Sequence, residues 1–258
     1  MPRTLSDIAK IRRGRRTLRF AILADIHGND VALREVLNDV QLEGIKQFII
    51  LGDVVMVGPN PQLVMNTIKA LNPTCWIKGN TDMWFEEITE DWTPSDERGE
   101  ELYRYFKFCK DRLTREDKLF LTNLPIKESI KILGKSILCV HGSPRKANEI
   151  MDYRVPIEEL EQMLDGVNET IVLCGHSHVP YVGKIAGKHI FNVGSVGRPL
   201  DGDKSASYGI LDLSLLESPQ FMVKRVNYSI DETIKISEQL NFPNMKKFKY
   251  TLESATIA

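Results

Sequence analysis

The sequence lacks the features of a membrane or secreted protein. No apolar run approaches the roughly 20 residues that span a bilayer, and the first residues lack the apolar stretch of a signal peptide. Cysteine is scarce, and three of the four cysteines lie inside apolar, strand-like runs, so no disulfide framework is indicated. We therefore expect a cytoplasmic protein that does not bind a membrane.

An excess of charge of either sign is also lacking. The 258 residues carry 34 basic and 35 acidic side chains, a formal net charge of -1, and 42% of them are hydrophobic, which is typical of a soluble protein with one large core. The exception is a basic arm, residues 1–16, where arginines cluster before the first apolar run. We favour a solvated arm over one that binds nucleic acid, although such a run suits a polyanion.

Strand-length apolar runs alternate with helical patterns in the first third of the chain. The runs are RFAILADI at 19–26, FIILGDV at 48–54 and CWIKGN at 75–80. A helix that ends near Gly44 separates the first two runs, and a helix from Pro61, capped by Asn60, separates the last two. This alternation predicts an α/β sheet.

The remaining chain divides into an insert and a region rich in strands. Residues 84–124 hold many aromatic and acidic side chains, and we predict a helical insert that forms a wall of a substrate cleft or a dimer contact. Strands dominate from residue 126, with helices expected at 156–164 and 230–240. We expect one domain, residues 17–241, followed by a C-terminal tail, residues 242–258.

Histidine is rare, and its positions are informative. Only five are present, and four of them follow apolar runs in glycine-flanked segments, while two further runs end in an aspartate and an asparagine. The carboxyl ends of strands meet at one rim of an α/β sheet, so these side chains should converge. The candidate metal ligands are Asp25, His27, Asp53, Asn80, His141, His176 and His178. Seven donors suit two ions that lie about 3.5 to 4 Å apart and share one carboxylate.

These segments resemble those of a known family. The order DIH, GDVV, GNTD, VHG and GHSH, followed by NVGSVGRP, is similar to the calcineurin-like metallophosphoesterases. GDVVMVGPNP, residues 52–61, resembles their small single-domain bacterial and archaeal subgroup, often described as phosphodiesterases or phosphatases. The resemblance implies a four-layer α/β/β/α sandwich of two mixed β-sheets flanked by helices.

The resemblance also implies roles for the ligands. Asp25, His27 and His178 would hold the first ion. Asn80, His141 and His176 would hold the second, and Asp53 would bridge the two. A hydroxide held between the ions would attack phosphorus in line, so that Asp53, Asn80 and His141 also serve catalysis. Manganese is our choice among manganese, iron, cobalt, nickel and zinc, because this mixed donor set accepts any of them.

Thr81 is where the chain departs from many family members, which have a histidine that protonates the leaving group. A threonine hydroxyl is far too weak an acid for that role. General acid catalysis is typically worth ~10²- to 10⁴-fold, so we expect diesters and activated monoesters as substrates and simple alkyl monoesters to react poorly. His189 is an alternative acid, but its place on a predicted strand favours a structural or surface role.

Three polar residues have two interpretations each. Asn29 either contacts the substrate phosphate or orients the hydroxide. Arg198 either clamps a phosphate oxygen or forms a surface ion pair. Asp82 either orients a ligand or caps a helix that begins at Met83.

The function itself has alternatives. The favoured hypothesis is a phosphoesterase that acts on a small phosphate ester or nucleotide. A catalytically silent scaffold is possible, as in the retromer subunit that resembles this family, but the intact ligand set weighs against it. A nucleic-acid hydrolase recruited through the basic arm and a dinucleoside polyphosphate hydrolase are further alternatives. The sequence leaves homo-oligomer formation open.

Overall fold

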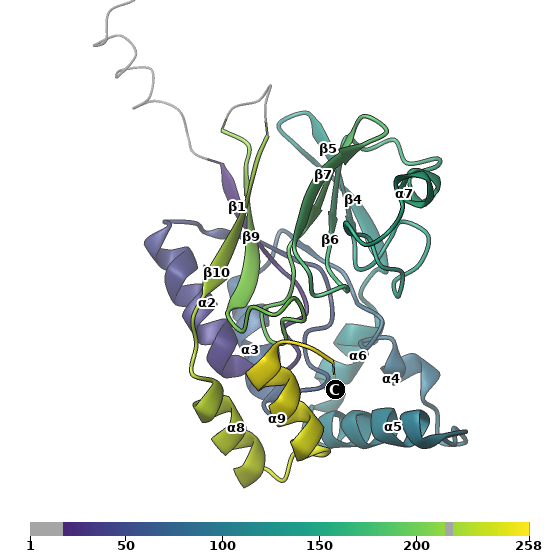
Figure 1. The fold of residues 1–258 in the computed structure, drawn as a ribbon, viewed down its shortest axis with the longest axis vertical. Helices are drawn as coiled ribbons and strands as arrows, with labels where there is room; N and C mark the ends of the chain where they lie inside the picture. The colour runs from purple at the N-terminus through teal and green to yellow at the C-terminus, as the bar shows by residue number, and fades with distance from the viewer. Residues whose placement is uncertain (1–17, 215–218, 258) are drawn as a thin grey trace, which may run out of the picture.

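Two five-stranded sheets packed face to face form the centre of the protein, with helices on their outer faces (Figure 1). This computed structural model describes residues 18–214 and 219–257, so the basic arm lies outside the described residues. Both sheets mix parallel and antiparallel pairs. The predicted α/β/β/α arrangement of two mixed sheets is confirmed.

The first sheet has the order β10-β9-β1-β2-β3 and the second the order β4-β5-β6-β8-β7. The strands of the first sheet are β1 (Arg19–Leu23), β2 (Gln47–Ile50), β3 (Cys75–Trp76), β9 (Ala206–Asp212) and β10 (Gln220–Val226). Those of the second are β4 (Lys127–Ile132), β5 (Lys135–Val140), β6 (Ile171–Cys174), β7 (Tyr181–Ile185) and β8 (Lys188–Asn192). The central strands β1, β2, β5 and β6 run parallel to a neighbour and are apolar on both faces, as buried parallel strands are.

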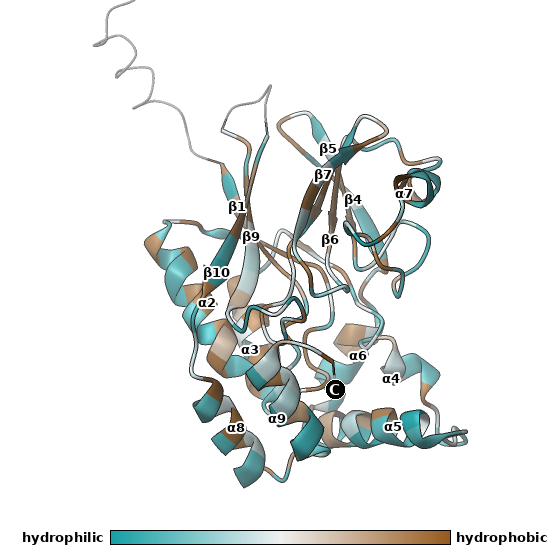
Figure 2. Ribbon diagram, viewed as in Figure 1, coloured by the Kyte–Doolittle hydropathy of each residue, from teal (hydrophilic) through white to brown (hydrophobic). Residues whose placement is uncertain are grey.

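Alternation along β1 divides the core into two layers. Phe20 and Ile22 point into the layer between the sheets, whereas Ala21 and Leu23 pack under the helices of the first sheet. Those helices include α2 (Asp30–Leu42) and α3 (Pro61–Leu71), and α7 (Ile157–Met163) covers the second sheet. Figure 2 shows brown and teal patches on the same outer helices, as expected for helices with one buried face.

The insert is helical, as the sequence predicts. It comprises α4 (Trp84–Glu87), α5 (Glu97–Lys110) and α6 (Arg115–Thr122). Thr114 caps α6 by accepting a hydrogen bond from the backbone N–H of Asp117 at 3.1 Å. The insert joins the body through buried aromatic side chains of α5, including Tyr105 and Phe106.

The segment expected to be a C-terminal tail contains an additional helix. After the predicted helix α8 (Ile230–Gln239), the chain forms α9 (Met245–Ser254). Phe248 and Leu252, one turn apart, are buried against the core of the first sheet, and the rings of Phe242 and Phe248 lie 4.6 Å apart. The sequence did not predict this helix, because its apolar stripe is narrow and charged residues surround it.

We predict that the contacts of α9 stabilise the domain. Leu252→Ala should lower the free energy of unfolding by about 2 to 5 kcal/mol, because the side chain is buried and its removal leaves a cavity. Urea unfolding measures this change. The matched control is Lys249→Ala on the exposed face of α9, with an expected change within about 0.5 kcal/mol. Equal midpoints for the two variants would show that α9 does not pack stably.

Candidate metal centre

The ends of strands from both sheets meet at one site. His27 follows β1 and His178 follows β6, and their Nε2 atoms lie 3.1 Å apart. His141, after β5, places its Nε2 3.1 Å from Oδ1 of Asn80, which follows β3. Segments far apart in the chain are thus brought together at the carboxyl ends of their strands.

Hydrogen bonds to backbone carbonyls define the orientation of three histidines. Nδ1 of His27 lies 2.9 Å from the carbonyl oxygen of Met56, and Nδ1 of His178 lies 2.5 Å from that of Arg198. Nδ1 of His141 lies 2.6 Å from the carbonyl oxygen of Leu51. A carbonyl only accepts, so each Nδ1 carries a hydrogen and each Nε2 is directed to the centre, where it can offer a lone pair to a cation once the ring is neutral.

The converging lone pairs fit a bound cation. The Nε2 atoms of His27 and His178 lie 3.1 Å apart, so a proton or a metal ion must lie between their lone pairs. Oδ1 of Asp25 is buried and lies 3.1 Å from Nε2 of His178, so it belongs to the same set of converging donor atoms. Two buried groups have ligand atoms within 4.8 Å of one another: Asp25 with His27 and His178, and Asp25 with Asp53 and His141.

Asp25 belongs to both groups, and Asp53, in the second group, also approaches a histidine of the first. Oδ2 of Asp53 is 3.5 Å from Nε2 of His141 and 3.8 Å from Nε2 of His27. His176 completes the rim: its backbone N–H donates to Oδ2 of Asp25 at 2.8 Å, and its ring lies 5.3 Å from that of His141. The structure therefore brings all seven candidate ligands to one rim, with a carboxylate placed between two sets of nitrogen donors.

Strained backbone accompanies the cluster. Five of the seven candidate ligands have positive φ angles between 50° and 63°: Asp25, His27, Asp53, His176 and His178. Residues with a Cβ rarely adopt this region, and each such residue costs about 1 to 3 kcal/mol unless the surroundings enforce it. Conformational strain of this kind gathers at functional sites.

Two glycines allow the ligand segments to approach the carboxylates. A Cβ on Gly175 would lie 2.6 Å from Oδ2 of Asp25, and a Cβ on Gly79 would lie 2.1 Å from Oδ1 of Asp53. Neither distance is compatible with a side chain. The glycines next to the candidate ligands are therefore required by close packing at the centre.

Asp82 joins two of the ligand segments through hydrogen bonds. Its carboxylate accepts hydrogen bonds from the backbone N–H groups of Asp53 at 2.7 Å and Gly79 at 2.9 Å. The cap interpretation is wrong, because α4 has no side-chain cap. Burial and the neighbouring Asp53 raise the pKa of Asp82 to about 7. The residue acts on the centre by holding the backbone that presents Asp53 and Asn80.

The charges in the cluster depend on one another. Burial opposes ionisation of Asp25, but His178 and His141 hold its pKa below the usual value. Burial and His178 lower the pKa of His27 to about 4, so this ring is neutral. Burial acts in the same direction on His141, yet Asp53 and Asp25 raise its pKa to about 10, so His141 keeps a proton when no metal replaces it.

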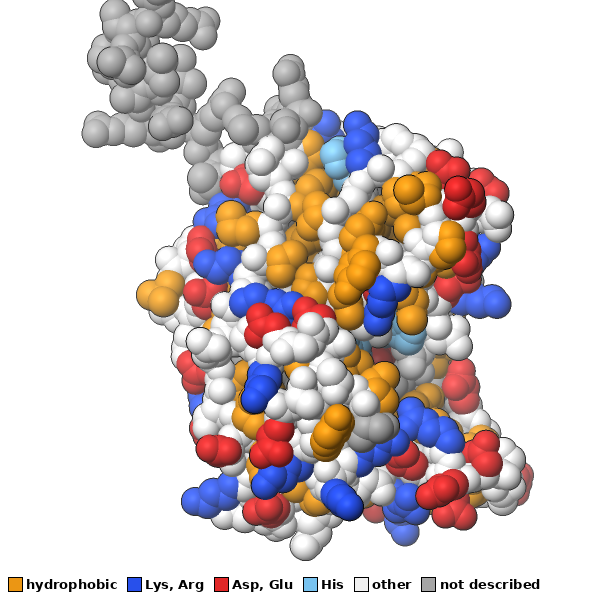
Figure 3. Space-filling model, viewed as in Figure 1, with side chains coloured by type: hydrophobic (Ala, Val, Ile, Leu, Met, Phe, Trp, Pro, Cys, Tyr) orange, Lys and Arg blue, Asp and Glu red, His pale blue; other side chains and the backbone are white. Residues whose placement is uncertain are grey.

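The cluster forms the floor of a cleft of 340 Å³. The helical insert supplies one wall through Trp84, Leu102 and Tyr105, in agreement with the prediction. Thr81 also lines the cleft; its backbone N–H donates to Oδ1 of Asp53 at 2.8 Å, and its buried Oγ1 lacks a partner. Figure 3 shows a pale blue histidine at this level, between the sheets and the helices below.

Arg198 lines the cleft, and the structure gives it no ion pair within the described ranges. Its half-buried side chain has a buried Nε without a partner, and burial lowers the pKa of the guanidinium. The surface ion pair is therefore not present. An unpaired donor in a cleft next to a cation site suits a substrate oxygen.

Asn29 does not reach the cleft. Its Oδ1 caps α2 by accepting from the N–H of Ala32 at 3.1 Å, and its Nδ2 donates to the carbonyl of Gly197 at 2.9 Å. The hydroxyl of Thr233 donates to the same Oδ1 at 3.2 Å. The amide has no group left for a phosphate, so the expected substrate contact gives way to a positioning role beside Arg198. His189 is also remote, with its ring 5.5 Å from that of Phe221.

This combination of sandwich fold and buried Asp/His cluster is found in metal-dependent phosphoesterases. The chain belongs to the calcineurin-like phosphoesterase superfamily, whose domain model matches residues 18–215. It is 32% identical over 217 residues to the uncharacterized protein MJ0912 of Methanocaldococcus jannaschii, a match that covers 74% of this chain and 82% of that protein.

Two solved structures share the fold. The metallophosphoesterase of Sphaerobacter thermophilus superposes with a TM-score of 0.75 and 25% identity, over 93% of this chain and 100% of that one. The hypothetical protein PH1004 of Pyrococcus horikoshii gives a TM-score of 0.79 with 23% identity, over 93% and 99% of the two chains. None of the helices in residues 18–214 and 219–257 has the length and hydropathy needed to cross a membrane.

We predict that metal binding displaces a proton from His141. At about pH 8 the imidazole is protonated, because its pKa in the metal-free protein is about 10, whereas a metal ligand must be neutral. Binding should release about one proton per chain, and the apparent affinity should rise with pH until it passes this pKa. Calorimetry of Mn²⁺ binding in buffers of different ionisation enthalpy counts the proton. His141→Ala should abolish the release; an unchanged count in this variant would contradict the assignment.

Proposed function

We propose that the protein is a dinuclear metal-dependent phosphoesterase that hydrolyses phosphodiesters or activated phosphomonoesters. The observation that carries the proposal is the convergence of buried nitrogen and carboxylate donors on the floor of a cleft, with the Nε2 atoms of His27 and His178 3.1 Å apart. Membership of the phosphoesterase superfamily supports the reaction class.

The donors divide into two sets. Asp25, His27 and His178 would hold the first ion, and Asn80, His141 and His176 would hold the second; Asp53, whose Oδ2 approaches His27 and His141, would be shared. Nitrogen, carboxylate and amide donors together suit manganese, and also iron, zinc, nickel or cobalt. When bound, two such ions lower the pKa of a water nucleophile and offset the negative charge of the phosphate.

The side chains around the metal site orient the ester. Arg198 lines the cleft and donates from its guanidinium to a phosphate oxygen. Trp84, Leu102 and Tyr105 offer an apolar wall on which an aromatic or nucleoside group can pack. Thr81 provides a hydroxyl but no acid, so the leaving group must depart without a proton from this position. Activated diesters and phenolic monoesters meet that requirement better than simple alkyl esters.

The first test is turnover of chromogenic esters. Metal-stripped protein refilled with Mn²⁺ should hydrolyse bis-(p-nitrophenyl) phosphate, with a higher kcat/KM than for p-nitrophenyl phosphate. Asp53→Asn should lower kcat/KM at least about 100-fold, because it removes the shared carboxylate. The variant must keep its thermal unfolding profile. Absence of turnover with each of the five candidate metals, although two ions bind per chain, would refute the proposal and favour a scaffold.

The second test supplies the missing acid. Thr81→His should raise kcat/KM for an alkyl phosphomonoester at least about tenfold, since general acid catalysis typically contributes ~10²- to 10⁴-fold and an introduced side chain captures part of it. The gain for bis-(p-nitrophenyl) phosphate should be small, because p-nitrophenolate leaves unaided. Thr81→Ser is the control, since it keeps a hydroxyl at this place. A rise of the same size for both substrates would exclude proton donation as its cause.

A further inference from the structure

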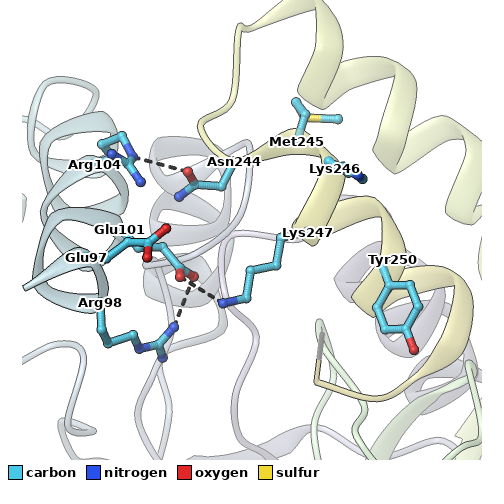
Figure 4. A pocket seen from close by; sticks show the side chains of 9 residues that line it. All are labelled: Glu97, Arg98, Glu101, Arg104, Asn244, Met245, Lys246, Lys247 and Tyr250. Carbon is cyan, nitrogen blue, oxygen red and sulfur yellow. Dashed lines mark hydrogen bonds and ion pairs between the residues drawn. The ribbon is translucent and has the colours of Figure 1, made fainter.

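A second hollow lies between α5 and α9 and is larger than the cleft. Its volume is 820 Å³, within the range of pockets that hold small molecules. Figure 4 shows side chains from both helices around it, with Lys247 directed across the gap toward Glu101 and Arg98. The hollow therefore exists only because α9 packs where it does.

The hollow and the cleft share part of their lining. Arg98 and Glu101, one turn apart on α5, line both. Arg98 is close enough to Arg198 for its charge to contribute to the lowered pKa of that guanidinium. The cleft and the second hollow therefore adjoin along α5.

Positive charge predominates in the hollow. Four cations line it, Arg98, Arg104, Lys246 and Lys247, against two carboxylates. Glu101 is already engaged by Lys247 at 2.8 Å and by Arg98 at 3.0 Å. Arg104 has only Glu100, at 3.7 Å, as an ion-pair partner. Lys246 has no ion pair within the described residues, so this wall carries uncompensated charge.

Hydrogen-bond donors accompany that charge. Oδ1 of Asn244 accepts a hydrogen bond from Nε of Arg104 at 3.1 Å, which holds the guanidinium of Arg104 at the start of α9. Asn244 begins α9 in a left-handed conformation and makes no side-chain cap, and the first turn of α9 holds no acid. The N–H groups at that helix start add a favourable potential for an anion.

We propose that this hollow binds a second phosphate of the substrate, so that the enzyme acts on small nucleotide-like phosphodiesters that carry a further phosphate on one arm. The inference rests on the proposed function. The reacting ester sits over the metal rim, and the distal phosphate sits among Arg104, Lys246 and the amide of Asn244. Met245 and Tyr250 provide apolar surface in the same hollow for the sugar or base between the two phosphates.

Equilibrium binding tests the subsite without turnover. Calorimetry should show that the protein binds adenosine 3′,5′-bisphosphate about tenfold more tightly than adenosine 5′-monophosphate, because a charge-assisted hydrogen bond adds about one decade of affinity. Lys246→Glu should abolish this preference. Lys249→Glu is the matched control: it makes the same charge change on α9, and Lys249 does not line the hollow. Equal affinities for the two nucleotides, or equal loss in both variants, would overturn the proposal.

A kinetic comparison separates this inference from the proposed function. Thymidine 5′-(p-nitrophenyl phosphate) and its 3′-phosphorylated form differ only in the second phosphate, and KM should be about tenfold lower for the latter. Turnover of both esters with equal KM values overturns the subsite and leaves the phosphoesterase intact. Failure of both esters and of bis-(p-nitrophenyl) phosphate refutes the phosphoesterase, and a bisphosphate preference that Lys246→Glu abolishes still supports the anion subsite.

Discussion

The crowding of buried nitrogen and carboxylate donors at one rim is the constraint on which the architecture depends. Imidazole nitrogens from the two sheets approach to 3.1 Å with their hydrogens directed outward to backbone carbonyls. Such an arrangement persists only if the surrounding chain enforces it or a cation neutralises it. Left-handed residues, glycines without room for a Cβ and the backbone hydrogen bonds of Asp82 all hold the donors in place.

Much of this site follows from the sequence, because the relevant pattern is local. An apolar run followed by glycine and a polar residue reports a strand end, and strand ends of an α/β sheet converge. The same pattern did not predict the roles of Asn29 and Asp82. An asparagine after a strand suits a helix cap as well as a phosphate contact, and only the tertiary hydrogen bonds to Gly197 and to Asp53 decide between the roles.

The sequence patterns could not predict the element boundaries or the helix α9, for different reasons. β3 is only two residues long. After Trp76 the chain makes one further hydrogen bond to β2, from the N–H of Ile77 to the carbonyl of Ile50, and then turns toward the site. The buried residues of α9 are Phe248, Thr251 and Leu252, of which only Phe248 and Leu252 are apolar. A segment with two apolar residues among lysines has the pattern of an exposed segment. Only its contacts with the aromatic cluster show that one face is buried.

The sheet order has a consequence for how the chain reaches this state. β1, β2 and β3 are joined by local crossovers and pair in parallel, whereas β9, which pairs with the other edge of β1, comes about 190 residues later. His27 and His178 are separated by 151 positions. Contacts between distant segments close slowly, because the loop entropy must be lost first. The metal pocket therefore assembles late in folding, and a chain that has formed only its first parallel unit offers an ion an incomplete set of ligands.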